Sequence, residues 1–220
     1  MTNYAVSDLV KEVKVILDRN QESAALVPDD SDTLSQRVLI QSRIVDAAKL
    51  ILTDAPSKFV EGTKLADSKV SWQSSYGAYV GKVKLPSDLI RILSVKVSDW
   101  IRPAKLISEN DDEYKLQSCR FGIRGNVERP IAAIAHTRGE RYIELYTSNT
   151  DDATLDLSYV KLPFIQNDMI ELPQTLVDAV KYMTAYLVCV SLGDNDTANG
   201  LLSVAKKLAG ILDVEPSQMQ

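Results

Sequence analysis

The sequence has few of the residues that most catalytic and redox centres use. It holds one histidine, His136, and two cysteines, Cys119 and Cys189, among 220 residues. A histidine-dependent triad or a multi-histidine zinc site must therefore use His136 or does not exist. A hydrolase with Cys119 as nucleophile and His136 as base stays open as one hypothesis. We otherwise expect no catalytic residues, and two cysteines this far apart favour a reducing compartment.

Recognisable cofactor motifs and long apolar runs are also missing. Residues 121–125 (FGIRG) contain two glycines, but no Lys-Ser/Thr pair or helix follows them, so a phosphate-binding loop is excluded. The acidic runs 29–30, 111–113 and 151–152 lack the staggered ligands and the bend glycine of a calcium loop. The longest apolar run, residues 183–192, is shorter than the roughly 20 residues that span a bilayer. We expect no cofactor, no metal ion and no membrane association.

The charge balance argues against a general nucleic-acid binder. The chain has 25 Lys and Arg against 30 Asp and Glu, which gives a net charge of -5, whereas such binders are usually basic. An acidic wall would still let DNA slide past without gripping it. The basic residues gather in residues 82–129, while the two ends of the chain are acidic, and opposite charge on two parts of one molecule suits head-to-tail packing of copies.

Helical periodicity occupies the two ends of the chain. Apolar residues at helical spacing predict helices over residues 8–20, with Ser7 as N-cap, and over residues 32–53. A long helix follows Pro173, and a last helix follows an N-cap at Asp194 or Asp196. Residues 61–81 are polar and indicate a long loop with at most one edge strand.

Between residues 82 and 160 the period changes to two, which is typical of strands. Residues 131–136 and 141–147 predict a hairpin, and residues 154–160 a further strand. We therefore expect an α+β fold in which N- and C-terminal helices form a helical bundle with an inserted antiparallel β-sheet or small barrel. The expected domains are a helical domain (1–60 and 170–213), a β-rich insertion (61–169) and a flexible tail (214–220).

The order of these elements resembles that of head-to-tail connector (adaptor) proteins of tailed bacteriophages, including those of short-tailed and crAss-like phages. Four pieces carry the resemblance over nearly the whole chain, and none of them is diagnostic alone. They are the helices 8–20 and 32–53, the corner LPSDLIR (85–91) with the strand that runs to Asp99-Trp100, the strand LSYV (157–160) before Pro163, and Leu172-Pro173 opening an Ala/Tyr-rich helix that one more helix follows.

The resemblance implies a structural role. Such proteins form a twelve-fold ring in the virion neck, below the portal protein, after assembly in the host cytoplasm. The ring extends the channel through which double-stranded DNA passes without sequence-specific binding, and tail or further ring proteins bind to it. The large strand block departs from the smaller, mainly helical family members. By the same resemblance, the portal- or neighbour-binding residues would be Leu201, Val204, Leu208, Ile211, Leu212, Val214 and Pro216.

A second set of candidates comes from the strand block. Its arginines would form a solvated loop, or would pair with acids of a neighbouring subunit or touch DNA in the channel. Its aromatic residues would form a docking patch or pack onto the domain. These subunit-interface or channel candidates are Arg120, Arg124, Arg129, Trp72 and Tyr76. An alternative function is another phage tail-completion or binding module that captures a strand along an open sheet edge.

Overall fold

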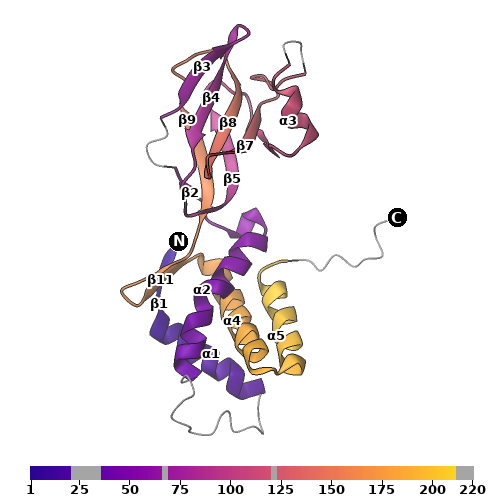
Figure 1. Cartoon of the computed structure of the whole chain (residues 1–220). Coiled ribbons are helices and arrows are strands. Elements are labelled where there is room, and N and C mark those ends of the chain that lie inside the picture. Colours follow the sequence, from indigo (N-terminus) through magenta and orange to yellow (C-terminus); the bar gives the residue numbers. More distant parts are fainter. Residues whose placement is uncertain (21–35, 66–68, 120–122, 212–220) are drawn as a thin grey trace, which may run out of the picture. The chain divides into compact units, whose positions relative to one another are not determined.

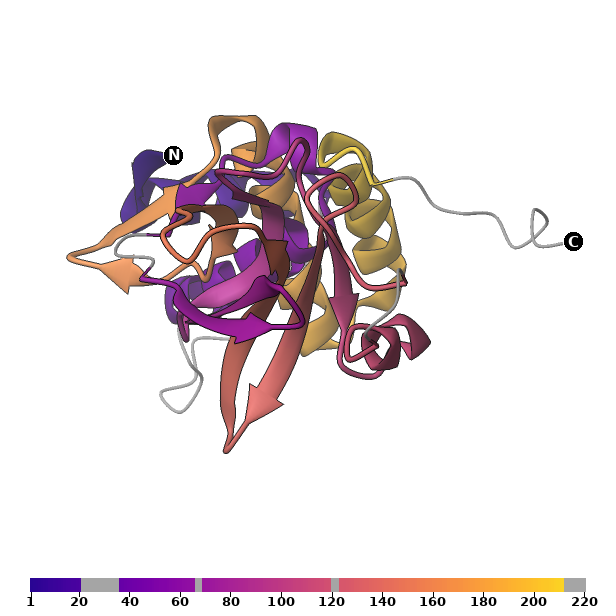
Figure 2. The ribbon, with the colours of Figure 1, turned by 90° about the horizontal axis from the view of Figure 1, so that it is seen from above.

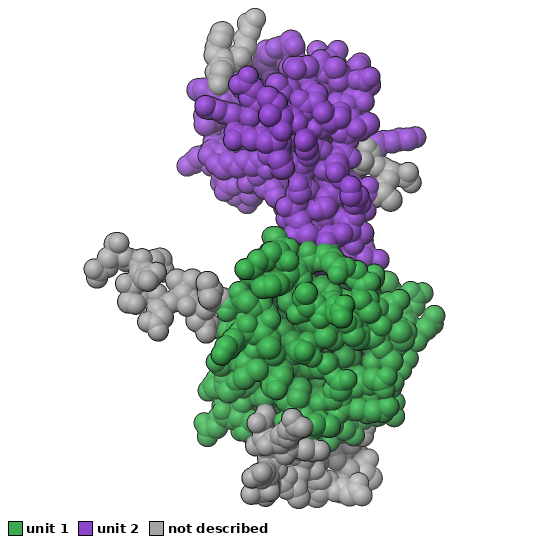
Figure 3. Space-filling model, turned by 180° about the vertical axis from the view of Figure 1, so that it is seen from behind, with its two compact units in different colours: residues 1–61, 162–220 green, residues 62–161 purple. Residues whose placement is uncertain are grey.

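The computed structural model describes residues 1–20, 36–65, 69–119 and 123–211 (Figure 1). The candidates Arg120, Leu212, Val214 and Pro216 lie outside these residues, as do the expected start of the second helix and the expected tail. The chain divides into two compact units, shown in Figure 3: unit 1 is Met1–Glu61 with Leu162–Gln220, and unit 2 is Gly62–Lys161.

Four helices make up most of the described part of unit 1. They are α1 (Val6–Asn20), α2 (Gln36–Asp54), α4 (Val177–Leu192) and α5 (Asn195–Leu208). α4 packs against each of the other three helices, and α5 packs against α4 at the edge of the group (Figure 1). The central helix α4 buries residues around much of its circumference, Cys189 among them, as its apolar sequence predicts.

The stretch Gln174–Leu192, which includes α4 and the 3₁₀ turn η2 (Gln174–Leu176), is long and apolar enough to cross a membrane by length and composition. Its contacts within unit 1 give those apolar residues a second explanation, because α1, α2 and α5 all pack on α4. A core helix of a folded unit needs the same composition as a membrane span.

A small sheet accompanies these helices. β1 (Thr2–Ala5) pairs antiparallel with β11 (Met169–Leu172), which also pairs with β10 (Ile165–Gln166). The backbone N–H of Val6 donates to the carbonyl of Asp168 over 2.8 Å, so α1 starts directly where this pairing ends. The helix therefore begins at Val6, and the expected N-cap Ser7 lies inside it.

Unit 2 is built from two sheets. One has the strand order β2 (Thr63–Lys64), β9 (Leu155–Lys161), β5 (Leu89–Val97). The other has the order β3 (Ser71–Ser75), β4 (Ala78–Lys84), β8 (Glu140–Ser148), β7 (Ile131–Thr137), β6 (Lys105–Ser108). The β7–β8 hairpin can be followed in Figure 2, and the short helix α3 (Asp112–Leu116) follows β6. The loop expected at residues 61–81 instead holds β2, β3 and the start of β4.

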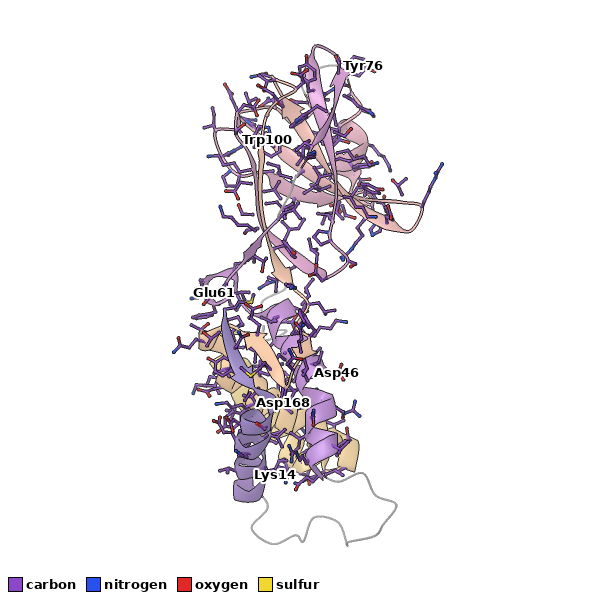
Figure 4. All side chains as sticks on the ribbon, turned by 90° about the vertical axis from the view of Figure 1, so that its left-hand side faces the viewer. Lys14, Asp46, Glu61, Tyr76, Trp100 and Asp168 are labelled. Carbon is purple, nitrogen blue, oxygen red and sulfur yellow. The ribbon has the colours of Figure 1, made fainter. Side chains whose placement is uncertain are left out.

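The two sheets of unit 2 share one core. Most of its buried side chains come from β4, β5, β8 and β9, and Trp100, which follows β5, is only 2% exposed. The indole N–H of Trp100 donates to the carbonyl of Thr147 over 2.8 Å, which satisfies the one polar group of this large side chain. Figure 4 labels Trp100 within unit 2.

The expected fold class is wrong. The described residues form eleven strands in three sheets and only five α-helices, so the fold is mixed α and β with more sheet than predicted, and it is not a helical bundle with an inserted sheet. The helices themselves carry the sheet of β1, β10 and β11, and β6 pairs parallel with β7. Local periodicity misses such pairings because β1 and β11 come from opposite ends of the chain and are only four residues long.

Candidate interaction surfaces

The last described helix has more apolar surface than its own packing uses. The N-cap of α5 is Asp194, whose side chain accepts from the N–H of Thr197 over 3.2 Å, so the structure selects one of the two caps that the sequence left open. Small side chains on one face let α5 lie close against α4, and these buried residues are Ala198, Leu201 and Ala205. Leu201 therefore belongs mainly to the core of unit 1, with only 3% of its surface exposed.

A second stripe runs beside that buried face. Val204 is 39% exposed and Leu208 is 44% exposed, and half-buried Ile211 follows directly after the end of the helix, beyond Gly210. We call Val204, Leu208 and Ile211 the α5 stripe. The sequence predicted these residues as a binding surface, and the structure describes all three on the last helix or directly after it.

The α5 stripe borders a groove in unit 1. Ile16 of α1 and Tyr182 of α4 line it together with Gly200, Leu201 and Val204 of α5, around a cavity of about 630 Å³. Asp196 and Thr197 form the remaining lining. Val204 thus belongs both to the stripe and to the wall of the groove, and a partner that covers the stripe would also reach the groove.

Arg124 and Tyr76 come together in unit 2, at the turn between β3 and β4. The Arg124 guanidinium donates to the hydroxyl of Ser75 over 3.1 Å and to its carbonyl over 3.3 Å. It also lies 6.0 Å from the ring centroid of Tyr76, at the limit of a cation–π contact. Tyr76 is 64% exposed at the hairpin tip, where Figure 4 labels it. Arg124 thus braces the β3–β4 turn through neutral acceptors of Ser75.

Trp72 has a packing role. Its indole N–H donates to the carbonyl of Ala153 over 3.1 Å, and its side chain packs against the core of unit 2. A Cβ at Gly81 on the neighbouring strand would lie 2.7 Å from the Trp72 ring, so the glycine makes room for the indole. Of the two readings that the sequence left open for Trp72, the contacts favour packing.

Arg129 lies in a different part of unit 2, beside a pocket with a partly apolar floor. The pocket has a volume of about 430 Å³. It lies among β6, α3 and the start of β7, and we call it the basic pocket. Its lining residues are Arg102, Lys105, Glu113, Leu116, Gln117, Ile123, Arg129, Pro130 and Ile131. Sequence reasoning named Arg129 but missed Arg102 as its neighbour, because no local spacing links the two.

A carboxylate network on β8 ties α3 to the sheet. Glu144 accepts hydrogen bonds from the hydroxyls of Tyr114 (3.0 Å) and Tyr146 (2.8 Å), and Lys82 Nζ lies 3.4 Å from its other oxygen. Burial and the hydrogen bond to Glu144 raise the pKa of Tyr146. The same two causes raise the pKa of Tyr114, which is less buried than Tyr146. All members of this network have partners, so it positions α3 rather than leaving a reactive group free.

His136 pairs with an acid. Its Nδ1 lies 2.9 Å from Glu109 Oε1, and its backbone N–H donates to Glu109 Oε2 over 2.9 Å. These bonds lower the pKa of Glu109. Cys119 is a free thiol that is partly exposed, and no contact with His136 is recorded among the described residues. Within the same residues, no group of three or more His, Cys, Asp and Glu side chains could hold a metal ion.

The two units carry opposite net charge. Unit 1 has 10 Lys and Arg against 17 Asp and Glu, and unit 2 has 15 against 13.

In comparisons with known proteins, no protein-family model matches the chain, and no curated protein matches it.

Proposed function

We propose that this chain is a structural protein of a tailed-bacteriophage virion, a subunit of the connector ring that joins the portal vertex of the capsid to the tail. In this role copies of the chain assemble into a ring of about twelve in the neck, and double-stranded DNA passes through the lumen without sequence-specific binding. The ring contacts the portal protein on one side and tail or further ring proteins on the other. The role is mechanical and requires no catalytic centre.

The α5 stripe is the observation that carries this proposal. α5 already satisfies its packing on α4 through small side chains, yet Val204 and Leu208 stay about two-fifths exposed beside a groove. Covering each of them fully contributes roughly 1 kcal/mol, since complete burial of such a side chain is worth roughly 1.5–3 kcal/mol. One contact of this size is weak, but the same contact repeated around a closed ring adds up through multivalency.

The charge distribution supports the same reading. Unit 1 is acidic and unit 2 is slightly basic, so the like parts of two copies repel and the unlike parts attract. A contact between different surfaces of identical copies is heterologous, and heterologous contacts close into rings when the rotation between copies permits.

Imaging the purified chain tests the proposal. Electron microscopy of the chain alone, and of the chain mixed with the portal protein of the same phage, is expected to show rings or portal particles that carry one additional ring. Mass measurement of the same samples gives the number of copies. A chain that stays monomeric at every concentration, and never joins portal particles, contradicts the proposal.

A second candidate function is a tail-completion or binding module that captures a strand. β3 forms one edge of the five-stranded sheet, and most of its residues are exposed or half-buried. An unpaired edge can accept a strand of a partner through backbone hydrogen bonds. Hydrogen exchange separates the two candidates, because a captured strand protects the amides of β3, whereas a ring contact protects the region of the α5 stripe.

A further inference from the structure

The apolar side chains that form the floor of the basic pocket in unit 2 are exposed to solvent. Ile123 is 60% exposed and Leu116 is 37% exposed, and both line the pocket together with half-buried Ile131. Exposed aliphatic side chains that gather around a concave site differ from single surface apolar residues, because one ligand can cover all of them at once.

The walls of the basic pocket are held in place before any ligand binds. Gln117 is only 2% exposed, and its side-chain nitrogen donates to the carbonyl of Glu113 over 2.9 Å. Its side-chain oxygen accepts from the N–H of Gly125 over 2.9 Å. On the opposite side, the N–H of Lys105 donates to the carbonyl of Pro130 over 2.9 Å. These bonds join α3, β6 and the segment before β7, so little ordering is needed when the pocket is filled.

The pocket carries two positive charges that nothing in the described residues neutralises. Lys105 pairs with Glu113 at 2.5 and 2.7 Å, so these two lining charges cancel. Arg102 and Arg129 are exposed, and neither side chain has a hydrogen-bond or ion-pair partner in the described part of the chain. The site therefore offers two free guanidinium groups beside an apolar floor.

This combination selects for a ligand that is both acidic and apolar. Guanidinium groups bind carboxylates through paired hydrogen bonds, and an aliphatic side chain of the ligand covers Ile123 and Leu116. A nucleic-acid backbone would satisfy the arginines but would leave the apolar floor in water. The chemistry of the pocket thus favours an acidic peptide segment over DNA.

The chain itself contains such a segment directly after α5. Residues 212–216 read Leu-Asp-Val-Glu-Pro, so apolar and acidic side chains alternate over four positions. The segment belongs to the acidic unit 1, whereas the basic pocket belongs to unit 2.

We propose that residues 212–216 of one copy dock in the basic pocket of a second copy, where Asp213 and Glu215 pair with Arg102 and Arg129 and the aliphatic side chains cover Ile123 and Leu116. This contact deepens the proposed function, because it names the surface of unit 2 that a neighbouring ring subunit would occupy. It links acidic and basic parts of different copies and is therefore heterologous.

A peptide-binding assay tests the contact without any need for a ring. The acceptor is the full chain with Asp213→Asn and Glu215→Gln, whose own segment has lost the charges that pair with the arginines. The probe is a fluorescent peptide of residues 211–220, and anisotropy reports binding. Adding Arg102→Glu and Arg129→Glu to the acceptor is expected to weaken binding by about tenfold, since each reversal replaces an attraction by a like-charge repulsion. Raising the salt concentration is expected to weaken it as well.

A matched control carries the same change of charge elsewhere on unit 2. Arg138 at the tip of the β7–β8 hairpin and Lys69 are both exposed and lie outside the pocket lining. Arg138→Glu with Lys69→Glu is expected to leave peptide binding within about twofold of the acceptor. No binding of the peptide, or equal loss in the control, overturns the proposal. Preferential binding of a peptide of residues 21–35, or loss of DNA binding alone on reversal of the arginines, overturns it too.

Mixing two full-length variants shows which copy supplies the segment. One variant has the reversed pocket, Arg102→Glu with Arg129→Glu, and the other has the reversed segment, Asp213→Lys with Glu215→Lys. Each alone is expected to associate more weakly than the unmodified chain, and an equimolar mixture is expected to recover association, because every acidic surface again meets a basic one. Recovery only when all four changes are combined in one chain would mean that the contact is intramolecular and would overturn the proposal.

The experiments distinguish failure of the docking contact from failure of the proposed connector function. If rings form and charge reversal does not weaken them, the docking contact is wrong while the connector role stands. If the peptide binds as expected but no ring or portal complex ever forms, the pocket is real and the connector role is wrong.

Discussion

Unit 1 and unit 2 use their apolar residues differently. In unit 2, side chains from two sheets meet in one core around Trp100. In unit 1, α4 is enclosed by three helices, whereas α5 contacts α4 and still exposes Val204 and Leu208. The helical unit therefore has an apolar helix surface left over. The sheet unit has a smaller apolar floor flanked by Arg102 and Arg129, whose side chains have no partner among the described residues.

This difference shows where a partner would act in each unit. A left-over stripe on a helix is a surface for burial of apolar area, with little demand on charge. The basic pocket depends on charge and on a fixed shape, so it is suited to discrimination between segments. Interfaces made from both kinds of surface combine affinity with a defined register.

The contrast between unit 1 and unit 2 fails if their two cores do not unfold independently. Trp100→Ala removes the largest buried side chain of unit 2 and is expected to lower the stability of that unit by about 3–5 kcal/mol. Both tryptophans, Trp72 and Trp100, belong to unit 2, so fluorescence during denaturation follows this unit alone. Helical circular dichroism, which unit 1 dominates, is expected to change little.

Ile44→Ala is the matched change in unit 1. Ile44 is 1% exposed on α2, and its loss is expected to cost about 2–5 kcal/mol. The helical signal should then melt earlier while the tryptophan transition stays in place. If either substitution shifts both signals equally, the two units unfold as one, and the contrast between them loses its thermodynamic meaning.

A pair of glycines on and after α5 sharpens the account of unit 1. Gly210 has φ +67°, and a Cβ there would lie 2.5 Å from the Phe59 ring, so Gly210→Ala is expected to cost about 1–3 kcal/mol. Gly200 lies within α5 and has open space around it, so Gly200→Ala is expected to stabilise the helix by about 0.5–1 kcal/mol. Urea titrations followed at the helical signal measure both. The same sign for both would show that the end of α5 is not held against Phe59.

The smallest expected effect concerns pH and unit 2. The pKa of Glu109 is lowered in the folded chain, mainly by the hydrogen bond from the backbone N–H of His136. A lowered folded pKa contributes stability above the unfolded pKa of about 4.3, and this contribution disappears as the pH falls through the folded pKa. Glu109→Gln is expected to flatten the dependence of the tryptophan melting temperature on pH between about 5 and 3. An unchanged pH profile in Glu109→Gln would assign the acid sensitivity of unit 2 to other carboxylates.

Elements with strong local signals could be predicted from the sequence. The β7–β8 hairpin follows from alternating residues around Gly139, which has φ +82° at the turn. α5 follows from its helical spacing and its cap at Asp194. An edge strand was expected within residues 61–81, but β3 could not be placed there because its sequence SWQSS is mostly polar and has no apolar alternation. The helix α3 was missed because five residues give no helical period.

The two candidate surfaces could not be predicted equally well from the sequence. The α5 stripe is local, so apolar spacing predicted the helix that carries it, and the resemblance to connector proteins indicated its residues as a binding surface. The basic pocket is not local, because Arg102 follows β5 while Arg129 precedes β7, and the parallel pairing of β6 with β7 lies between them. Tertiary pairing also distinguishes the arginines, since the Arg124 side chain bonds Ser75 whereas that of Arg129 has no partner in the described part of the chain.

Assembly of α5 variants tests the central claim most directly. Val204→Asp with Leu208→Asp places two charges in the α5 stripe, and Ser203→Asp with Lys207→Asp places two new acids on other exposed positions of the same helix. Light scattering of the full chain, alone and with the portal protein, is expected to show loss of rings or portal complexes for the first variant and their retention for the second, with both chains folded by circular dichroism. Rings that form equally well with a charged stripe would contradict the account.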